Sequence, residues 1–383
     1  MRSLDEFAGE KLKSLDEAKL RRSPAVTARD NIWAERDGRR LLSFSCNDYL
    51  NLSQHPDVIA AALDATTRYG VGAGASRLVT GNHPLYADLE SRLARLKGTD
   101  AACVFGSGYL ANTGIIPALA GPGDLIVVDE LSHSCIHTGT KLSGAAVETY
   151  RHADVEHAEA LLVAHRAGKT RALIATDGVF SMDGDLAPLV DLSALAMRFD
   201  AWLLADDAHG LGVVGGGRGS IFANGKPADV PLQMGTLSKA VGAYGGYLCA
   251  SQPVIDLMRT RARTFVYSTG LPPSVVAAAS ASLDIIERET DYVAQPLRKA
   301  RMFARALNLP AAQSAIVPVI VGDNEAALAA SNMLRDEGFL VVAIRPPTVP
   351  QGTARLRFAF TAQHPDNEIE RLAEIVRMRV LRH

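Results

Sequence analysis

A single lysine lies in a stretch of the chain that leaves little room around it. Lys239 is part of "QMGTLSKAVGAYGGYLCA", residues 233–250, where it is surrounded by small residues and four glycines. Crowding can strip water from an amine, and desolvation lowers its pKa, which makes the lysine a nucleophile able to form a Schiff base. The competing interpretation is a solvated lysine in a turn, because charged side chains are mostly exposed.

Two further reactive side chains follow an apolar run. Asp206 ends "AWLLAD", residues 201–206, and His209 follows three residues later. The cofactor that combines a lysine Schiff base with an aspartate on its ring nitrogen is pyridoxal phosphate. We therefore expect Asp206 to keep that nitrogen protonated and His209 to hydrogen-bond the ring oxygen. In isolation, Asp206 could equally cap a helix, and a lone histidine is often structural.

The phosphate of such a cofactor requires small residues at a helix N-terminus. The segment "FGSGYLANTG" supplies them, because Gly108 and Tyr109 open a helical run directly after a strand. The glycine-rich "GVGAGASR", residues 70–77, follows no strand and does not match GxGxxG, so a dinucleotide loop is excluded. The chain also contains no Walker A sequence.

His133 lies in "LSHSCIH", after the apolar run "DLIVVD". His137 follows four residues later, as in a metal-binding pair, but no third ligand is evident. A flat imidazole stacked on a cofactor ring is therefore the favoured interpretation of His133.

Apolar runs alternate with helical patterns, which predicts an α/β fold with a mostly parallel sheet covered on both faces. The expected strands are 41–46, 101–105, 124–129, 171–176, 201–206 and 232–236. The expected helices are 4–20, 84–98, 188–200 and a long helical stretch at 273–307. From about residue 315 the pattern reads strand, helix, strand, strand, helix. Ligands gather beyond the carboxyl ends of parallel strands, where Asp206 and Lys239 are expected.

We expect three regions along the chain. They are an N-terminal helix and short strand at 1–50, a large cofactor-binding α/β domain at 51–285, and a small C-terminal α+β domain at 286–383.

Bulk properties limit the possible functions. The 383-residue chain can bury a large core, but its net charge of −2 argues against a nucleic-acid or membrane-surface role. Its four cysteines form no CxxC pair, which argues against a zinc site and favours a reducing, cytoplasmic location. The N-terminus lacks an apolar h-region and no apolar run approaches about 20 residues, so neither a signal peptide nor a membrane span is expected.

Eight segments, in order over nearly the whole chain, resemble the α-oxoamine synthase family of fold-type I pyridoxal-phosphate enzymes. Within that family the resemblance is greatest to the oxononanoate synthases of biotin biosynthesis. The segments are "FSCNDYLNLSQHP" (44–56), "GSGYLAN" (106–112), "LSHSCIHTGTKLS" (131–143), "GVFSMDGDLAPL" (178–189), "DDAHGLGVVGGGRG" (206–219), "TLSKAVGAYGGY" (236–247), "YSTGLPP" (267–273) and "IRPPTVPQGTARLRFAFTA" (344–362).

The resemblance implies a role for individual residues. The implied catalytic residues are the Schiff-base Lys239, the stacking His133 and the acid Asp206 on the pyridine nitrogen. The other implied cofactor contacts are Gly108, Tyr109, Ser181, His209 and Thr236, and the implied substrate contacts are Arg21, Asn47, His133, Arg345 and Thr348. Because family members are homodimers, Ser268 and Thr269 would reach the partner subunit's cofactor.

The activity implied by the resemblance is a decarboxylative condensation. L-alanine and a pimeloyl thioester, carried on coenzyme A or acyl carrier protein, would give 8-amino-7-oxononanoate, CO2 and free thiol. Lys239 would be the general base that removes the α-proton. Sister enzymes that share the cofactor site remain open, namely glycine C-acetyltransferase, 5-aminolevulinate synthase and serine palmitoyltransferase. A non-catalytic pyridoxal-phosphate-binding protein is the alternative from another class.

The chain departs from the family pattern at two positions. Asp177 stands where family members often have a glutamate, and Leu237 where a phenylalanine often follows the threonine. The shorter acid would shift a hydrogen bond near the site without removing its charge, and Leu237 keeps the apolar character.

Overall fold

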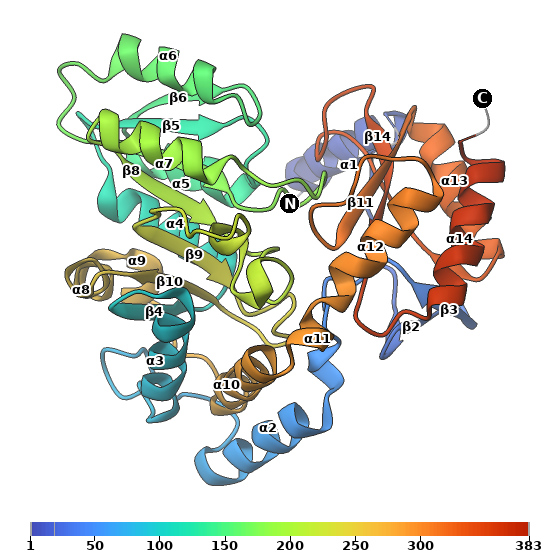
Figure 1. The fold of residues 1–383 in the computed structure, drawn as a ribbon, viewed down its shortest axis with the longest axis horizontal. Coiled ribbons are helices and arrows are strands. Elements are labelled where there is room, and N and C mark those ends of the chain that lie inside the picture. The colour runs from blue at the N-terminus through green and yellow to red at the C-terminus, as the bar shows by residue number, and fades with distance from the viewer. Residues whose placement is uncertain (1, 19, 382–383) are drawn as a thin grey trace.

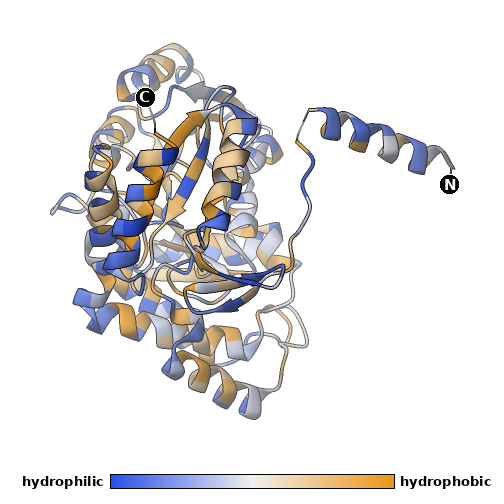
Figure 2. Ribbon diagram, turned by 90° about the vertical axis from the view of Figure 1, so that its right-hand side faces the viewer, coloured by the Kyte–Doolittle hydropathy of each residue, from blue (hydrophilic) through white to orange (hydrophobic). Residues whose placement is uncertain are grey.

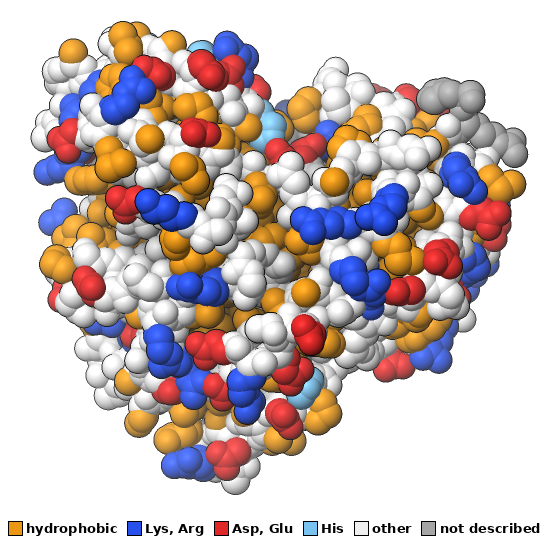
Figure 3. Space-filling model, viewed as in Figure 1, with side chains coloured by type: hydrophobic (Ala, Val, Ile, Leu, Met, Phe, Trp, Pro, Cys, Tyr) orange, Lys and Arg blue, Asp and Glu red, His pale blue; other side chains and the backbone are white. Residues whose placement is uncertain are grey.

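The chain forms two lobes in a computed structural model that describes residues 2–18 and 20–381 (Figure 1). The lobe drawn on the left contains a large sheet between helices, and the lobe on the right contains two smaller sheets with their helices. The space-filling view in Figure 3 shows basic, acidic and hydrophobic side chains mixed over this face, in keeping with the small net charge.

A seven-stranded sheet forms the centre of the large lobe. Its strands, in spatial order, are β4 (Ala101–Phe105), β10 (Gly246–Ala250), β9 (Leu232–Thr236), β8 (Trp202–Asp206), β7 (Ala172–Asp177), β5 (Leu125–Asp129) and β6 (Ala146–Tyr150). β10 runs antiparallel to both of its neighbours, and the pairs from β9 to β6 are all parallel. The mostly parallel sheet expected from the sequence is therefore confirmed.

Helices cover both faces of this sheet because its central strands carry apolar side chains on both sides. Ile126 and Val128 of β5 pack into one core, whereas Leu125 and Val127 pack into another. One face is covered by α4 (Gly108–Leu119), α5 (Ser134–Ser143), α8 (Gln252–Arg261) and α9 (Arg263–Val266). The other is covered by α3 (Leu85–Lys97), α6 (Val155–His165), α7 (Leu189–Arg198) and α10 (Pro273–Arg288).

The right-hand lobe is built on the sheet β11 (Ile316–Gly322), β14 (Ala354–Ala359) and β13 (Val342–Ile344). Its helices are α12 (Gln295–Ala306), α13 (Asn324–Asp336) and α14 (Asp366–Arg379). Buried aromatic side chains fill the space between sheet and helices, and Phe303, Phe358 and Phe360 pack with ring centroids 4.7 to 5.2 Å apart.

The N-terminal strands join the right-hand lobe. β1 (Ala28–Asp30), β2 (Trp33–Arg36) and β3 (Arg39–Ser43) form an antiparallel sheet, and β12 (Phe339–Leu340) adds to β3 in parallel. The first of the two strands expected after the helix, at 339–344, is thus divided, because its last three residues form β13 and pair with β14. The domain boundaries stay a prediction.

Most expected elements are confirmed within about two residues at each end. The expected strands of the large sheet are shifted by one residue at most, and the helical stretch 273–307 divides into α10, α11 (Thr290–Val293) and α12. The strand expected at 41–46 ends earlier, as β3. Three 3-10 turns (Leu52–Gln54, Gly215–Gly217 and Ser220–Phe222) and α2 (Pro56–Tyr69) complete the described chain.

The N-terminal helix α1 (Arg2–Glu17) projects from the rest of the chain, to which an extended stretch joins it (Figure 2), and Leu15 near its C-terminal end lines a groove with Phe180 and Val349. The helix expected at 4–20 ends at Glu17, and Lys19 lies outside the described residues. Within the described ranges, no helix is both long and apolar enough to cross a membrane.

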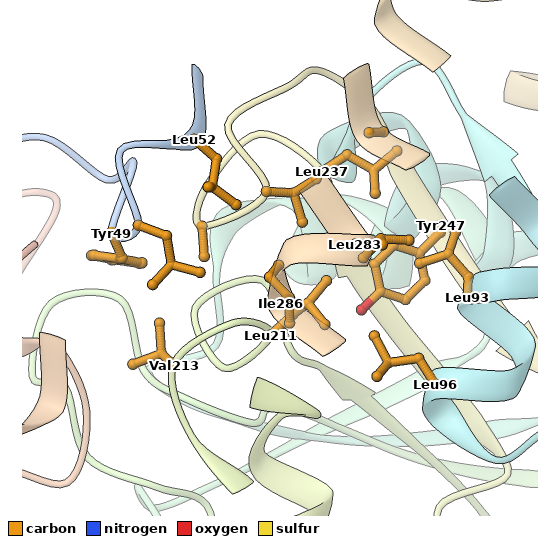
Figure 4. Close-up of a cluster of buried hydrophobic side chains, with 14 of the residues drawn as sticks. Tyr49, Leu52, Leu93, Leu96, Leu211, Val213, Leu237, Tyr247, Leu283 and Ile286 are labelled. Carbon is orange, nitrogen blue, oxygen red and sulfur yellow. The ribbon is translucent and has the colours of Figure 1, made fainter. Parts of the chain in front are cut away.

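A hydrophobic cluster supports the turn that carries Lys239. Leu237, two residues before the lysine, is fully buried and packs among Leu52, Leu211 and Leu283 (Figure 4). This packing holds the turn against the large sheet and so fixes the backbone that carries Lys239.

Candidate active site

A cavity of about 190 Å³ lies at the carboxyl ends of β7, β8 and β9. It is lined by Ser107, Gly108, Tyr109, His133, Cys135, Asp177, Val179, Asp206, Ala208, His209, Met234, Thr236, Ser238 and Lys239. The fold thus brings together side chains that are up to 132 positions apart in the sequence, from Ser107 to Lys239. All of the expected cofactor contacts except Ser181 line this cavity.

Lys239 projects from a turn that closes on itself after β9. The Leu237 N–H donates to the Gly245 carbonyl at 3.0 Å, and the Thr236 hydroxyl donates to the same oxygen at 2.7 Å. Burial lowers the pKa of Lys239, and the positive charge of Arg357 lowers it further, while Asp206 acts in the opposite direction. The amine is therefore easier to deprotonate than an exposed lysine.

Asp206 is buried at the end of β8. Its Oδ2 accepts a hydrogen bond from Asn112 Nδ2 at 2.7 Å, and its Oδ1 accepts one from the Ala208 N–H at 3.0 Å. Burial raises the pKa of Asp206 above its ordinary value, while His133 and these two donors oppose that rise. A cation placed in the cavity would favour the ionised carboxylate.

Asp177 lies beside Asp206, because the two residues are paired across β7 and β8. Its Oδ1 accepts a hydrogen bond from the backbone N–H of His133 at 3.0 Å. Burial and the charge of Asp206 raise the pKa of Asp177 well above its ordinary value. This aspartate holds the loop on which His133 caps α5.

His209 faces a polar cluster on the other side of the cavity. Its Nδ1 lies 2.7 Å from the Tyr49 hydroxyl, which contacts Asn47 Oδ1 at 3.3 Å. Burial, followed by the charges of Lys239 and Arg357, lowers the pKa of His209 well below its ordinary value. His209 is therefore a neutral imidazole, and the Tyr49 hydroxyl fixes which of its nitrogens is available.

Arg357 is a buried cation beside this cluster, from the middle of β14. Its Nε donates to the Ser181 carbonyl at 2.6 Å, and its Nη1 donates to Asn47 Oδ1 at 3.1 Å. Its hydrogen-bond acceptors in the described part of the chain are the neutral oxygens of Ser181, Asn47 and Tyr49. Arg357 is 6% exposed, so its charge is buried beside these neutral acceptors.

The opposite end of the cavity is formed by the N-terminus of α4. Ser107 caps the helix, accepting from the Leu110 N–H at 3.1 Å, while the N–H groups of the first turn have no intrahelical acceptor. β10 approaches this turn closely, since a Cβ at Gly246 would lie 2.4 Å from the Ser107 carbonyl oxygen and 2.7 Å from the Gly108 nitrogen. Only glycine permits this contact.

A wider groove of about 910 Å³ continues from His133 toward the N-terminal segment. Its apolar wall includes Leu15, Leu20, Phe180 and Val349, and Ser181 and Thr348 also line it. Arg22 reaches this groove and donates through Nη2 to the Thr348 hydroxyl at 2.7 Å.

Three of the expected substrate residues line neither the cavity nor the groove. Arg21 forms an exposed ion pair with Asp16 at 2.7 Å, and Arg345 is half-buried without lining the cavity or the groove. Asn47 contacts neither cavity directly but holds Arg357. Ser268 and Thr269 belong to a segment that pairs with Ser76 and also lies outside both cavities.

The sequence analysis missed Arg357, Tyr49 and Asn112. Arg357 belongs to "ARLRFA", in which two arginines occupy alternate positions of a strand whose residues are all buried. Two buried charges on one face of a strand are an available signal. Tyr49 and Asn112 carried no comparable signal. Among the described residues, no group of three His, Cys, Asp or Glu could hold a metal ion.

Comparison with known proteins identifies relatives that span the site. The family described as aminotransferase class I and II matches residues 39–376. An 8-amino-7-oxononanoate synthase of Methylocella silvestris is 68% identical over 342 residues, which are 89% of this chain and 97% of that protein.

Two solved structures extend the comparison to three dimensions. A serine palmitoyltransferase variant from S. paucimobilis, with bound pyridoxal phosphate and myriocin, has a TM-score of 0.91 at 30% identity and covers 98% of this chain and 97% of its own. An 8-amino-7-oxononanoate synthase from Francisella tularensis has a TM-score of 0.76 at 26% identity, covering 89% of this chain and 98% of its own.

Proposed function

Because the chain belongs to the class I and II aminotransferase family, we propose that it is a pyridoxal-phosphate enzyme that condenses L-alanine with a pimeloyl thioester. The products are 8-amino-7-oxononanoate, CO2 and the free thiol, as in biotin synthesis. The observation that carries this proposal is a partly buried amine, Lys239, sharing one cavity with the buried carboxylate of Asp206, in a chain 68% identical to such a synthase.

The donor set of the cavity fits pyridoxal phosphate. The first turn of α4 and the hydroxyls of Thr236 and Ser238 suit a phosphate, and Gly246 keeps that end of the cavity narrow. Asp206 suits a protonated ring nitrogen, because a cation would offset the cost of burying its charge. When bound, the cofactor supplies an aldehyde for the amino group and a ring that withdraws electrons from the α-carbon.

Lys239 would carry the cofactor and then act as the general base. Its lowered pKa leaves Nζ able to take up a proton from the α-carbon of the amino acid. Asp206 would keep the proton on the ring nitrogen, and Asn112 and Ala208 hold its carboxylate in place.

The two histidines would hold the ring from different sides. His133 would lie over its face, because its ring lines the cavity at the N-terminus of α5. His209 would contact the ring oxygen through Nε2, because its Nδ1 is already engaged by Tyr49. Ser181, next to the cavity, has its backbone fixed by Arg357.

Arg357 would bind the carboxylate of the amino acid. It lies close enough to Lys239 to lower the lysine's pKa, and its present acceptors are all neutral oxygens. A carboxylate would pair with this buried charge in a charge-assisted hydrogen bond. The sequence analysis named Arg345 among the substrate contacts, and Arg357 is the better placed of the two.

Replacing Arg357 with methionine is expected to raise the KM for L-alanine by about 100-fold or more, because a buried charged contact to the substrate is lost. The KM for the thioester should change far less. Steady-state kinetics with each substrate varied in turn measures both values, and Arg345→Met is the matched control. A larger rise in the alanine KM for the control would return the role to Arg345.

The groove lined by Leu15 and Leu20 would take the acyl chain. Its apolar wall suits methylene groups, and a pimeloyl chain ends in a free carboxylate that requires a cation. Arg22 reaches the groove beside Thr348, whereas Arg21, the residue expected from the family, turns toward Asp16. We assign the acyl carboxylate to Arg22 and Thr348.

Replacing Arg22 with alanine should raise the KM for the pimeloyl thioester by about tenfold, because a hydrogen bond to a charged group is lost at an exposed site. Arg21→Ala is the matched control and should change this KM by less than about twofold. Initial rates with varied thioester at saturating alanine separate the two. A larger rise in the thioester KM for Arg21→Ala than for Arg22→Ala would instead assign the acyl carboxylate to Arg21.

A homodimer is part of the proposal. Exposed apolar side chains occur around the 76–269 bridge, on Val71, Leu78, Val79 and Tyr267. Their burial against a second copy would bring Ser268 and Thr269 toward the partner's cavity. Light scattering should return twice the chain mass, and the mass of one chain would contradict this assembly.

A serine palmitoyltransferase is the second candidate, since such an enzyme superimposes with a TM-score of 0.91. The decisive experiment supplies alanine, glycine and serine together with pimeloyl, acetyl, succinyl and palmitoyl thioesters, and identifies products by mass. We expect 8-amino-7-oxononanoate to be the main product. The kcat/KM for alanine should exceed that for glycine by about 10- to 100-fold, because the two substrates differ by one methyl group. Faster turnover of serine with the palmitoyl thioester would reassign the chain to that activity.

A further inference from the structure

Two buried side chains connect His133 to Asp206. We propose that Asn112 and Cys135 are positioning residues, which hold the Asp206 carboxylate and the His133 imidazole in one hydrogen-bonded chain and keep the His133 proton on Nε2. The proposal rests on the proposed function for its kinetic consequences, but the hydrogen-bonded chain itself can be tested without turnover.

Asn112 forms the first half of this chain. It is fully buried in α4, and its Nδ2 donates to Asp206 Oδ2 at 2.7 Å and to Cys135 Sγ at 3.1 Å. Its Oδ1 is buried and has no partner among the described residues. Rotating the amide would place that oxygen against the Asp206 carboxylate, where two acceptors would repel each other, so the orientation of the amide is fixed.

Cys135 forms the second half. Its Sγ lies 2.8 Å from His133 Nδ1, and its backbone N–H also donates to that nitrogen at 3.3 Å. Burial raises the pKa of the Cys135 thiol, so the sulfur keeps its proton and acts as a donor. With two donors directed at Nδ1, that nitrogen must offer its lone pair, and the proton of the neutral imidazole lies on Nε2.

The packing of α4 against α5 makes this chain possible. A Cβ at Gly139 would lie 2.8 Å from the Asn112 carbonyl oxygen and 2.9 Å from the Ile116 side chain, so glycine allows the two helices to touch. Cys135, one turn earlier on α5, then reaches the Asn112 amide. The His133 backbone is held independently by Asp177.

The functional consequence is that the His133 imidazole and the Asp206 carboxylate are both held in fixed orientations toward the cofactor site. His133 would present its Nε2–H away from Cys135, and Asn112 would favour the ionised form of Asp206 by donating to it. The titratable groups around Asp206 are Asp177, Asp207, His133, Cys135, Lys239 and Tyr247. The charge of Asp207 is neutralised by an ion pair in which Lys97 Nζ lies 2.7 Å from Asp207 Oδ2.

The first test measures the His133 tautomer in the holoenzyme. Nitrogen-15 spectra of histidine-labelled protein, assigned with a His133→Gln variant, should show the proton on Nε2 in the wild type and in Cys135→Ser, whose hydroxyl can still donate to Nδ1 and accept from Asn112. In Cys135→Ala the Nδ1–H form should become populated. Cys103→Ala, another buried thiol on the same face of the sheet, is the control for an added cavity and should leave the spectrum unchanged.

The second test is kinetic. Cys135→Ala should lower kcat/KM by about tenfold or more through a misplaced His133, and Cys135→Ser should recover to within about threefold of the wild type. Asn112→Ala should move the acidic limb of the kcat profile to higher pH, because Asp206 then accepts a proton more readily as the pH falls.

An unchanged tautomer in Cys135→Ala, or an unchanged acidic limb in Asn112→Ala, overturns the positioning role of that residue. A wild type that makes no oxononanoate but retains the Nε2–H tautomer would instead count against the proposed function and leave the hydrogen-bonded chain intact.

Discussion

Substituting Lys239 with alanine is expected to lower the rate of condensation by about 10³-fold or more, because the general base of the proposed reaction is lost. Among the described residues, Lys239 is the one lysine that lines the cavity. No neighbouring amine is therefore available to replace it, and its turn is held rigid by Leu237.

The measurement pairs kinetics with chemical labelling. Borohydride reduction of the wild type should fix the pyridoxyl mass on the peptide that contains Lys239, and Lys239→Ala should lose the label. Lys226, on an exposed loop, provides the control variant and should retain both label and activity. A label on any other lysine of the wild type would disprove the assignment.

Substituting Asp206 with asparagine is expected to leave the cofactor bound and lower kcat by about 10²- to 10³-fold, since one preorganised charge at the reacting centre is lost. Asparagine has nearly the same shape, and its side chain can still accept from the Ala208 N–H. Absorbance of the bound cofactor and turnover at saturating substrates measure the two effects separately.

Asp207 is the natural comparison, since the sequence offers two adjacent acids. Its carboxylate is fully buried against Lys97, and it also accepts from the Ser220 N–H at 2.9 Å. Asp207→Asn should therefore lower the melting temperature, because the charge of Lys97 is left buried without its partner. Near-normal turnover of Asp206→Asn together with an inactive Asp207→Asn would show that Asp207, and not Asp206, holds the ring nitrogen.

The sequence alone determined the order of elements and the edge of the sheet at which the site forms. The runs that became β7, β8 and β9 are mostly apolar, which favours strands buried on both faces. Asp206 is the last residue of β8, and Lys239 follows the end of β9 by three residues. Parallel strands end at one edge of a sheet, so local patterns were enough to predict that these residues meet.

The antiparallel strand β10 was not predicted. It is a five-residue run directly after the glycines of the lysine turn, and a short apolar run does not reveal its direction. Its position between β4 and β9 follows from tertiary packing, in which Gly246 admits the N-terminus of α4.

The tertiary structure alone decided which polar residues surround the cofactor site. Arg21 and Arg22 are adjacent and chemically identical, yet only Arg22 meets Thr348, 326 positions away. Arg357 reaches Asn47 across 310 positions, and Asn112 reaches Asp206 across 94. Local patterns specify backbone conformation, whereas the direction of a charged side chain depends on the buried partners that the fold brings to it.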